Sequence, residues 1–341
     1  MRSSIKHIAK LGMATLVAGA LTVTATSALA GTNLRLSHSA PPGSERDLWA
    51  KEFAKRVQEQ TDERVKFRVY PANQLGDWEE TYDQLTQGSI DAAVQSLSTK
   101  YDKRLGISWF PYSVSDYKSA EQAWNVGGFL FNVMDNLLER QNLTLLAPYA
   151  NGMGGMAVGT SVEQPENPDA DHKSLKIRVW PSGAATHRPV LERLGYNTTT
   201  MPWAELYTGV QTGVIDGMIG GTPENAVRDW NGVVKTWVQL NDHFEVNWLV
   251  MNRKSISRVS EKDREIIRTI AKNIATERFE RVAQADEEYR QKLRDSGVTV
   301  VTFNDAEMEA ITQAVRKDVW PQIKDELGDE LYQLIAEQYA K

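Results

Sequence analysis

The sequence predicts an α/β protein of two similar lobes, and three observations indicate it. A helix-like stretch stops at a glycine and restarts as a short apolar strand twice, at residues 87–91 and 211–216. Asp91 and Asp216 are 125 positions apart, too far for a solenoid repeat, so each copy is expected in its own lobe. A long amphipathic stretch near the C-terminus can cross both lobes. Facing lobes form a cleft, and small-molecule sites favour clefts.

The first 30 residues have the pattern of a secretion signal. Three basic residues within the first ten are followed by a mostly apolar run at residues 11–23 and by Ala-Leu-Ala at 28–30. A membrane anchor is the alternative, but spanning a bilayer takes roughly 20 strongly apolar residues. We therefore expect an exported chain, cleaved near Ala30 and without stable membrane insertion. No cysteine follows the cleavage site, so no lipid anchor is expected.

Charge and composition exclude several classes of partner and site. Without residues 1–30 the chain has 36 basic and 45 acidic residues, a net charge of −9. Nucleic acids and anionic membranes reward a concentrated basic patch, so neither is expected as a partner. One buried arginine can still hold an anionic ligand. The absence of cysteine excludes disulfides, thiolate zinc sites, iron–sulfur clusters and a cysteine nucleophile.

The expected elements of the first lobe alternate between strand and helix periodicity. In chain order they are a strand at 34–38, a helix at about 45–60, a strand at 65–70, a helix at about 78–87, a strand at 90–94, a helix at about 119–140 and a buried strand at 143–147. The lobe thus opens as a β-α-β unit. The Gly-rich segment 151–155 is the best candidate for a crossover between lobes, because glycine tolerates the backbone angles that a hinge samples.

The second lobe is expected to repeat this order. Its elements are a strand at 175–179, a helix at 183–194, a helix at 202–212 and a strand at 214–216. From Ser260 onward, apolar residues recur at helical spacing until Gly297. We expect one helix of some 35 residues, roughly 50 Å long at 1.5 Å per residue. Two helices with an unmarked break are the alternative.

Three segments resemble the DctP-type substrate-binding proteins of tripartite ATP-independent periplasmic (TRAP) transporters. They are Tyr70-Pro-Ala-Asn-Gln-Leu-Gly-Asp77, Leu175-Lys-Ile-Arg-Val179 and Met201-Pro-Trp-Ala-Glu-Leu-Tyr-Thr-Gly-Val-Gln-Thr-Gly-Val-Ile-Asp-Gly217. Their order and spacing resemble those of the family, and the resemblance covers nearly all of the chain after the signal. It implies a class II-like venus-flytrap periplasmic binding protein, with a hinge between its lobes and a long helix spanning both. It also implies a receptor that hands its ligand to membrane permease subunits.

These expectations divide the chain into three parts. Residues 1–30 are the signal peptide. The first lobe comprises residues 31–151 plus about 247–286, and the second comprises residues 152–246 plus about 287–341.

Arg178 is the first candidate for a ligand contact. Its guanidinium is a flat fork of donors that can grip both oxygens of a carboxylate. An internal salt bridge, or an arginine at a strand end that reaches solvent, is the alternative from the residues alone. The resemblance implies the ligand role, because family members generally place an arginine in this strand to hold a substrate carboxylate.

Trp203 and Trp180 are the next candidates. The resemblance implies that the aromatic residue at position 203 stacks on the ligand, and an indole can pack an apolar skeleton or attract a cation. Core packing is the alternative for both. Trp78 and Trp248 are weaker candidates on the same grounds. Strand ends and the crossover supply candidate hydrogen-bond partners, each of which could instead be a satisfied turn residue: His38, Ser39, Gln95, Ser96, Tyr149 and Asn151.

Two departures from the family pattern leave the ligand open. Many members follow the Asp-Gly pair with Gln-Glu-Asn, whose asparagine helps to hold the carboxylate, whereas here Met-Ile-Gly-Gly at 218–221 follows. Members that bind sialic acids carry an arginine shortly after the Asn-Gly at the crossover, where this chain has Met153-Gly154. Neither a sialic acid nor a standard C4-dicarboxylate is therefore assumed. A monocarboxylate, a sugar acid, a zwitterion and an amine-bearing solute remain open.

The sequence favours a receptor over an enzyme. No two of its five histidines have the close helical spacing of a zinc site, and it has neither a Gly-x-Ser-x-Gly elbow nor a phosphate-binding loop. We expect no catalytic residues, metal or cofactor. Asp216 and Glu205 could form the acid/base pair of a secreted glycosidase, although both sit more simply at a strand end and on a helix turn. A chaperone or scaffold would need a broad apolar surface.

Overall fold

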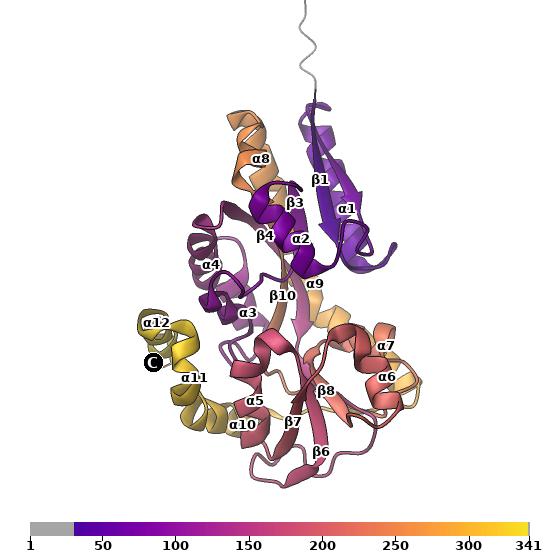
Figure 1. The fold of residues 1–341 in the computed structure, drawn as a ribbon. Coiled ribbons are helices and arrows are strands. Elements are labelled where there is room, and N and C mark those ends of the chain that lie inside the picture. Colours follow the sequence, from indigo (N-terminus) through magenta and orange to yellow (C-terminus); the bar gives the residue numbers. More distant parts are fainter. Residues whose placement is uncertain (1–30, 340–341) are drawn as a thin grey trace, which may run out of the picture. The chain divides into compact units, whose positions relative to one another are not determined.

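The structure is a computed structural model that describes residues 31–339, so the predicted signal peptide lies outside the described residues. Two sheets form its framework (Figure 1). The first contains β1 (Thr32–His38), β2 (Val65–Tyr70), β3 (Ala92–Gln95), β4 (Leu143–Met153) and β10 (Phe244–Asn252), in the order β2-β1-β3-β10-β4. The second contains β5 (Gly155–Val158), β6 (His172–Val179), β7 (Tyr196–Thr200), β8 (Gly217–Gly221), β9 (Thr236–Val238) and β11 (Thr299–Val301), in the order β11-β9-β5-β8-β6-β7.

Each sheet contains one copy of the helix–glycine–strand repeat. β1 pairs in parallel with β2 and β3, and β6 pairs in parallel with β7 and β8. β3 and β8 are the strands that follow the two glycines. The prediction of two similar α/β units is therefore confirmed.

Helices α1 to α4 accompany the first sheet. They are α1 (Glu45–Gln60), α2 (Trp78–Gln87), α3 (Tyr117–Trp124) and α4 (Phe129–Glu139), with a 3-10 helix at Lys103–Trp109. Ser44 caps α1 by accepting a hydrogen bond from the Asp47 amide, and Asp77 caps α2 in the same way. Helix α2 ends at Gly88, whose φ of 75° is the left-handed conformation that favours glycine.

The remaining helices follow the crossover. They are α5 (Ala184–Arg193), α6 (Leu206–Gln211), α7 (Pro223–Asp229), α8 (Arg253–Ser257), α9 (Glu261–Asp295), α10 (Asp305–Asp318), α11 (Trp320–Leu327) and α12 (Asp329–Tyr339), with 3-10 turns at Pro181–Gly183 and Trp203–Glu205. Among the described residues, no helix combines the length and apolar character needed to cross a membrane.

Five of the expected elements had wrong bounds. The single helix expected at 119–140 is split into α3 and α4, because Gly127 takes a positive φ of 89° and Gly128 caps α4. The helix expected at 202–212 begins as a 3-10 turn. Both strands after the repeat glycines start later than expected, β3 at Ala92 and β8 at Gly217, because the residues between glycine and strand complete the helix-ending turn. The buried strand expected at 143–147 continues to Met153.

The chain crosses between the sheets at two places that lie side by side. β4 leads through Gly154 into β5, and residues 239–243 lead from β9 into β10. β4 and β10 pair in antiparallel fashion from Met153 opposite Phe244 to Leu143 opposite Asn252, and both run along the middle of Figure 1. The Gly-rich crossover at 151–155 is thus confirmed.

Helix α9 is one unbroken helix of 35 residues, as expected. Ser260 caps it by accepting from the Asp263 amide. Ile270 and Ile274 pack with α1 and the first sheet, whereas Leu293 packs with Met218 of the second sheet. One rigid element therefore contributes to the cores of both units.

The exact division into lobes remains a prediction. The C-terminal helices contact segments assigned to both lobes. Trp320 Nε1 donates to Pro111 O at 2.8 Å, and Arg193 Nε of α5 donates to Asp318 Oδ2 of α10 at 2.7 Å.

Asp286 of α9 is buried against the crossover. Its Oδ2 accepts from Met153 N at 2.9 Å and from Tyr117 Oη at 2.7 Å. A Cβ at Gly152 would overlap the Asp286 carboxylate, so only glycine fits there. Burial raises the pKa of Asp286 to about 6, although these hydrogen bonds, Arg290 and Arg278 oppose the rise.

The raised pKa predicts an unusual pH dependence. The folded protein binds this proton more tightly than the unfolded chain, so the contribution of Asp286 to stability is fully present below about pH 4 and is lost as the pH rises through about 6. The shift corresponds to on the order of 3 kcal/mol. Relative to wild type, Asp286→Asn should therefore gain that much unfolding free energy between pH 4 and pH 7 in urea titrations.

Asp295→Asn, at an exposed position of the same helix, is the matched control. A difference between wild type and Asp286→Asn that is constant across this pH range would contradict the assignment.

Candidate functional site

Arg178 is a buried cation without a carboxylate partner. It lies near the end of β6 and is 1% exposed. Its Nε donates to Met201 O at 2.7 Å and its Nη1 to Ile219 O at 3.3 Å, both of which are backbone carbonyls. None of the described carboxylates lies within 4.0 Å of it. Burial lowers the pKa of Arg178 to about 10. The internal salt bridge considered from the sequence is absent from the described residues.

Trp203 lies beside this guanidinium. It starts the 3-10 turn after Pro202, and its ring centroid is 5.9 Å from Arg178 Cζ and 5.0 Å from the Trp230 ring. Its side chain is 41% exposed, which is unusual for tryptophan in this structure. The structure therefore joins the first two sequence candidates into a buried cation beside an accessible aromatic face.

A second group of candidates surrounds Arg46, which the sequence analysis missed. Arg46 Nη1 donates to Ser39 Oγ at 3.3 Å. With its amide oxygen turned toward Arg46, Asn151 accepts from Nη2 at 2.9 Å and donates to Asn247 Oδ1 at 3.2 Å. Asn247 Nδ2 donates in turn to Ser96 Oγ at 3.1 Å. One polar network thus links three predicted residues to an arginine.

One feature of the sequence could have identified Arg46 as a candidate site residue. Arg46 is the second residue of α1, and a cation in the first turn is opposed by the partial positive charge of the helix N-terminus. Its guanidinium lies over the Tyr149 ring, with Cζ 5.7 Å from the ring centroid. An arginine at such a position needs a reason beyond helix formation.

Three other candidates have internal partners. His38 and Asp47 are fully buried, with Nε2 and Oδ1 3.3 Å apart, and burial lowers the pKa of His38 to about 4. Gln95 Oε1 accepts from Thr81 Oγ1 at 2.6 Å, and Gln95 Nε2 donates to the backbone oxygen of the half-buried Trp78 at 3.1 Å. The assignment of His38, Gln95 and Trp78 as ligand contacts remains a prediction.

Trp248, one of the weaker candidates, is a core residue. It is fully buried and makes an edge contact with Trp124, their ring centroids being 5.6 Å apart. Core packing, the alternative considered from the sequence, therefore describes its environment in β10.

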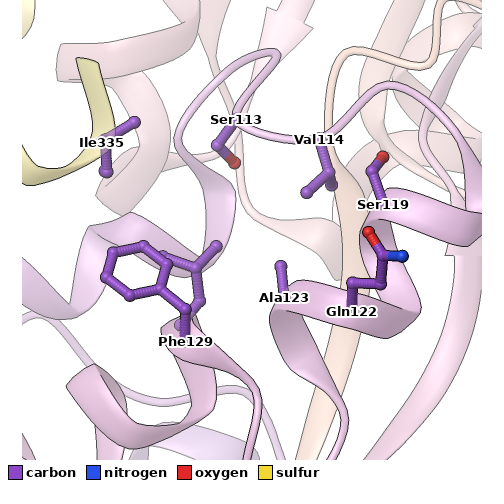
Figure 2. A pocket seen from close by; sticks show the side chains of 8 residues that line it. Ser113, Val114, Ser119, Gln122, Ala123, Phe129 and Ile335 are labelled. Atoms are coloured by element: carbon purple, nitrogen blue, oxygen red, sulfur yellow. The ribbon is translucent and has the colours of Figure 1, made fainter. Parts of the chain in front are cut away.

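Two cavities lie away from these groups. Figure 2 shows one of about 250 Å³, lined by Ser113, Val114, Ser119, Gln122, Ala123, Phe129, Leu130 and Ile335. The other, of about 330 Å³, is lined by Thr86, Tyr101, Asp102, Arg104, Leu137, Arg140 and Gln141. None of the predicted ligand residues lines either cavity. The candidate site is therefore defined by its charges and contacts.

A buried ion-pair network adjoins the crossover. His243 Nδ1 lies 2.6 Å from Asp242 Oδ2, His187 Nε2 lies 3.3 Å from the same oxygen, and His243 Nε2 lies 3.0 Å from Glu245 Oε2. Burial disfavours the imidazolium, but Asp242 and Glu245 outweigh it and raise the pKa of His243 to about 10. Burial lowers the pKa of His187. His243 is thus the cation of this network.

The same residues are the candidate metal ligands of the described chain. One donor atom each from His187, Asp242 and His243 lies within 4.8 Å of the others, a set that imidazole- and carboxylate-binding metals accept. Sequence spacing could not reveal it, because the two histidines come from separate elements. We assign the group as an ion-pair network because Asp242 already neutralises His243.

The comparisons with known proteins identify the family. The family model described as bacterial extracellular solute-binding protein, family 7 (DctP) matches residues 36–325. The chain belongs to this family. The predicted resemblance to the TRAP solute-binding proteins is thereby confirmed.

Individual relatives agree with this membership. A solute-binding protein of Chromohalobacter salexigens is 27% identical over 330 residues, which cover 96% of this chain and 93% of that protein. The ectoine-binding periplasmic protein TeaA of Halomonas elongata is 24% identical over 325 residues, covering 90% and 88%. Both relatives are named as binding proteins.

The fold is shared with solved family members. The TRAP periplasmic solute-binding protein of Desulfovibrio salexigens, with bound orotic acid, superposes with a TM-score of 0.78 at 19% identity, covering 91% of this chain and 99% of that one. This similarity confirms the two-lobed binding-protein fold.

Trp180 explains one departure of this chain from the DctP family pattern. Its indole contacts His187 at 4.5 Å and Trp109 at 5.9 Å between ring centroids. A Cβ at Gly220, which has φ 96°, would lie 2.7 Å from Trp180 Cε3, and one at Gly183 would overlap the indole. Position 220 is where the family motif has its asparagine, so the indole leaves no room for that side chain.

The ion-pair network makes a stability prediction. Asp242→Asn leaves the His243 imidazolium buried without its main counter-charge, which should lower the free energy of unfolding at pH 7 by about 3–5 kcal/mol in urea titrations. As a control, Asp169→Asn removes an exposed partner of Arg193, 3.0 Å away, and should cost at most about 1 kcal/mol. Equal, small losses for both variants would show that the buried pair is not charged.

Proposed function

We propose that the protein is the periplasmic receptor of a TRAP transporter, which captures a small organic acid between its two lobes and delivers it to membrane permease subunits. The observation that carries this proposal is the buried Arg178, held by backbone carbonyls, unpaired within the described residues and flanked by the exposed Trp203. A buried guanidinium is costly without a counter-charge. A ligand carboxylate supplies that charge in a bidentate geometry.

The comparisons support this proposal at the level of the family. The Desulfovibrio salexigens protein was solved with orotic acid, a carboxylic acid. TeaA is named for ectoine, whose carboxylate would also suit Arg178. Named relatives are periplasmic, which agrees with the secretion signal expected at residues 1–30.

An amine-bearing ligand without an acid group is less well supported. Its amine could stack on the Trp203 indole, but it would leave the charge of Arg178 without a partner. The carboxylates Glu245 and Glu224 already contact His243 at 3.0 Å and Arg228 at 2.8 Å. The glycosidase alternative also loses support. Asp216 Oδ2 accepts a hydrogen bond from Lys176 N at 2.7 Å, so this carboxylate stabilises the local fold. Glu205 is exposed on a 3-10 turn.

Capture proceeds by hinge closure in this proposal. A ligand first contacts one lobe, and closure then brings its carboxylate to Arg178 and its body to Trp203. Only contacts that the closed state has and the open state lacks shift the equilibrium toward closure. The paired crossover strands β4 and β10 are where the backbone would bend.

The test is a binding screen with matched variants. The chain without residues 1–30 is screened by thermal shift against organic acids, sugar acids, amino acids and ectoine, and hits are measured by calorimetry. Arg178→Ala should weaken binding of an acid on the order of 100-fold, because a charge-assisted bidentate contact is lost. Arg178→Lys should recover only part, because lysine keeps the charge but loses the fork.

Arg68→Ala and Arg68→Lys are the controls, since Arg68 is an exposed arginine over the Tyr70 ring, 5.0 Å from its centroid. They should bind like wild type. If both Arg178 variants also bind like wild type, Arg178 does not hold the ligand.

A further inference from the structure

The cavity of about 330 Å³ lined by residues of α2, α4 and the 3-10 helix at Lys103–Trp109 is rich in hydrogen-bond donors. We propose that it is a second binding site, which takes an organic anion whose carboxylate, sulfonate or phosphate group is carried on a flat, partly apolar body. We call it the Arg140 cavity, after the arginine in its lining. It contains none of the residues proposed to hold the transported ligand, so this inference goes beyond the proposed function and does not depend on it.

Arg140 offers an unpaired guanidinium to this cavity. Among the described residues, its side chain has no hydrogen-bond partner and no carboxylate within 4.0 Å. Arg140 caps the C-terminus of α4, where the partial negative charge of the helix end favours a cation. This position accounts for the positive charge, but it leaves the N–H groups of the guanidinium without acceptors from the described chain.

The carboxylate in the lining is held by the other arginine. Arg104 Nε donates to Asp102 Oδ1 at 2.9 Å and Arg104 Nη2 donates to Asp102 Oδ2 at 2.6 Å, which is a bidentate pair. The hydrogen bond from Arg104 is the main cause that lowers the pKa of Asp102, and Arg140 contributes from a greater distance. Outside the lining, Glu330 is the smallest of the influences on the charge of Arg104. The lining therefore contains two positive charges and one negative charge.

Gln141 adds a neutral donor to the same lining. Its Oε1 accepts from Tyr82 Oη at 2.7 Å, which holds the amide in one orientation. Its Nε2 is buried and has no acceptor among the described residues. A buried N–H group without an acceptor is unfavourable, and a ligand oxygen that reaches it would remove this cost. The free donors of the cavity thus favour a ligand group that only accepts hydrogen bonds, as an oxyanion does.

The rest of the lining can hold an apolar body. The Tyr101 ring is 47% exposed and stacks on Tyr82, with 6.0 Å between the ring centroids and 23° between the planes. The Tyr101 hydroxyl donates to Asp83 Oδ1 at 2.6 Å, which fixes the ring. Leu137 of α4 is half-buried in the same lining. A flat ligand can therefore stack on Tyr101 while its anionic group binds the arginine side.

The cavity of Figure 2 provides an internal comparison. The described residues that line it include serine hydroxyls and a glutamine amide but no charged side chain. Its volume, about 250 Å³, is similar to that of the Arg140 cavity. Charge therefore distinguishes the two cavities better than size does, and an anion should select the Arg140 cavity. The volume of the Arg140 cavity lies within the range of sites for organic ligands, which favours an anion with a body over a bare inorganic ion.

The experiment measures the binding of aryl anions to the chain without residues 1–30 by calorimetry. The probes are phenyl phosphate, benzenesulfonate and benzoate. Neutral benzamide tests the body alone, and inorganic phosphate tests the anion alone. At least one aryl anion should bind with a Kd on the order of 1 mM or tighter, and about fivefold or more tightly than either benzamide or inorganic phosphate.

Matched variants locate the site of this binding. Arg140→Gln should weaken it roughly tenfold, and Arg140→Lys should weaken it less because lysine keeps the charge but loses the fork. Arg178→Ala should leave it unchanged, since any separate binding of the probe beside Trp203 disappears in that variant. Arg68→Gln, at an exposed position, and Gln122→Ala, in the cavity of Figure 2, should also leave it unchanged.

A stability measurement separates binding from a structural role. Arg140 is exposed, so Arg140→Gln without ligand should melt within about 2 °C of wild type. A much lower melting temperature, with equal losses for the aryl anions and benzamide, would mean that Arg140 supports the fold and does not bind the probe.

The remaining outcomes also decide the inference. It is refuted if no aryl anion binds, if benzamide binds as tightly as the anions, or if Arg140→Gln binds like wild type. Loss of binding in Arg178→Ala would place the probe in the site of the proposed function instead. The proposed function is tested by the Arg178 variants with the acids of its own screen, so either proposal can fail while the other stands.

Discussion

The structure depends on the cost of a buried positive charge. Arg178 is enclosed at the end of β6 by backbone carbonyls, which orient its guanidinium without neutralising it. A protein that needs only stability would place a carboxylate there or remove the cation, since replacing buried charges by apolar residues is often neutral or favourable. In the proposed function, Arg178 contributes to ligand binding at the expense of the stability of the unliganded protein. The exposed Trp203 indole beside it would have the same cost.

Local sequence patterns predicted most of the framework. Helices α1 and α2 and strand β2 match their expected bounds because capping residues and period-two alternation are local signals. The errors arose where tertiary context decides. Gly127 and Gly128 divide α3 from α4, and this pair was overlooked within an otherwise helical pattern. The strands after Gly88 and Gly213 start late because the helix-ending turn uses more residues than an ideal one.

The candidate site was predictable only in part. Arg178 and Trp203 were found through the family resemblance, and the structure places them together. Arg46 was missed because its hydrogen bond with Asn151 joins residues more than 100 positions apart along the chain. Likewise, no local pattern unites His187 with Asp242 and His243. Ion pairs in a folded protein form between residues that are close in space but often far apart in the sequence. A single sequence therefore seldom shows which charged side chains are already paired.

The position of β10 has a consequence for the order in which this protein can fold. It lies between β3 and β4 in the first sheet, although 90 residues separate it from β4 along the chain. A ribosome that has released the chain up to β9 has produced β3 and β4, but not the strand that joins them. The first sheet therefore stays incompletely paired until β10 has been synthesised. Such long-range pairing is expected to slow folding, because the loop between β4 and β10 has to close before their contacts form.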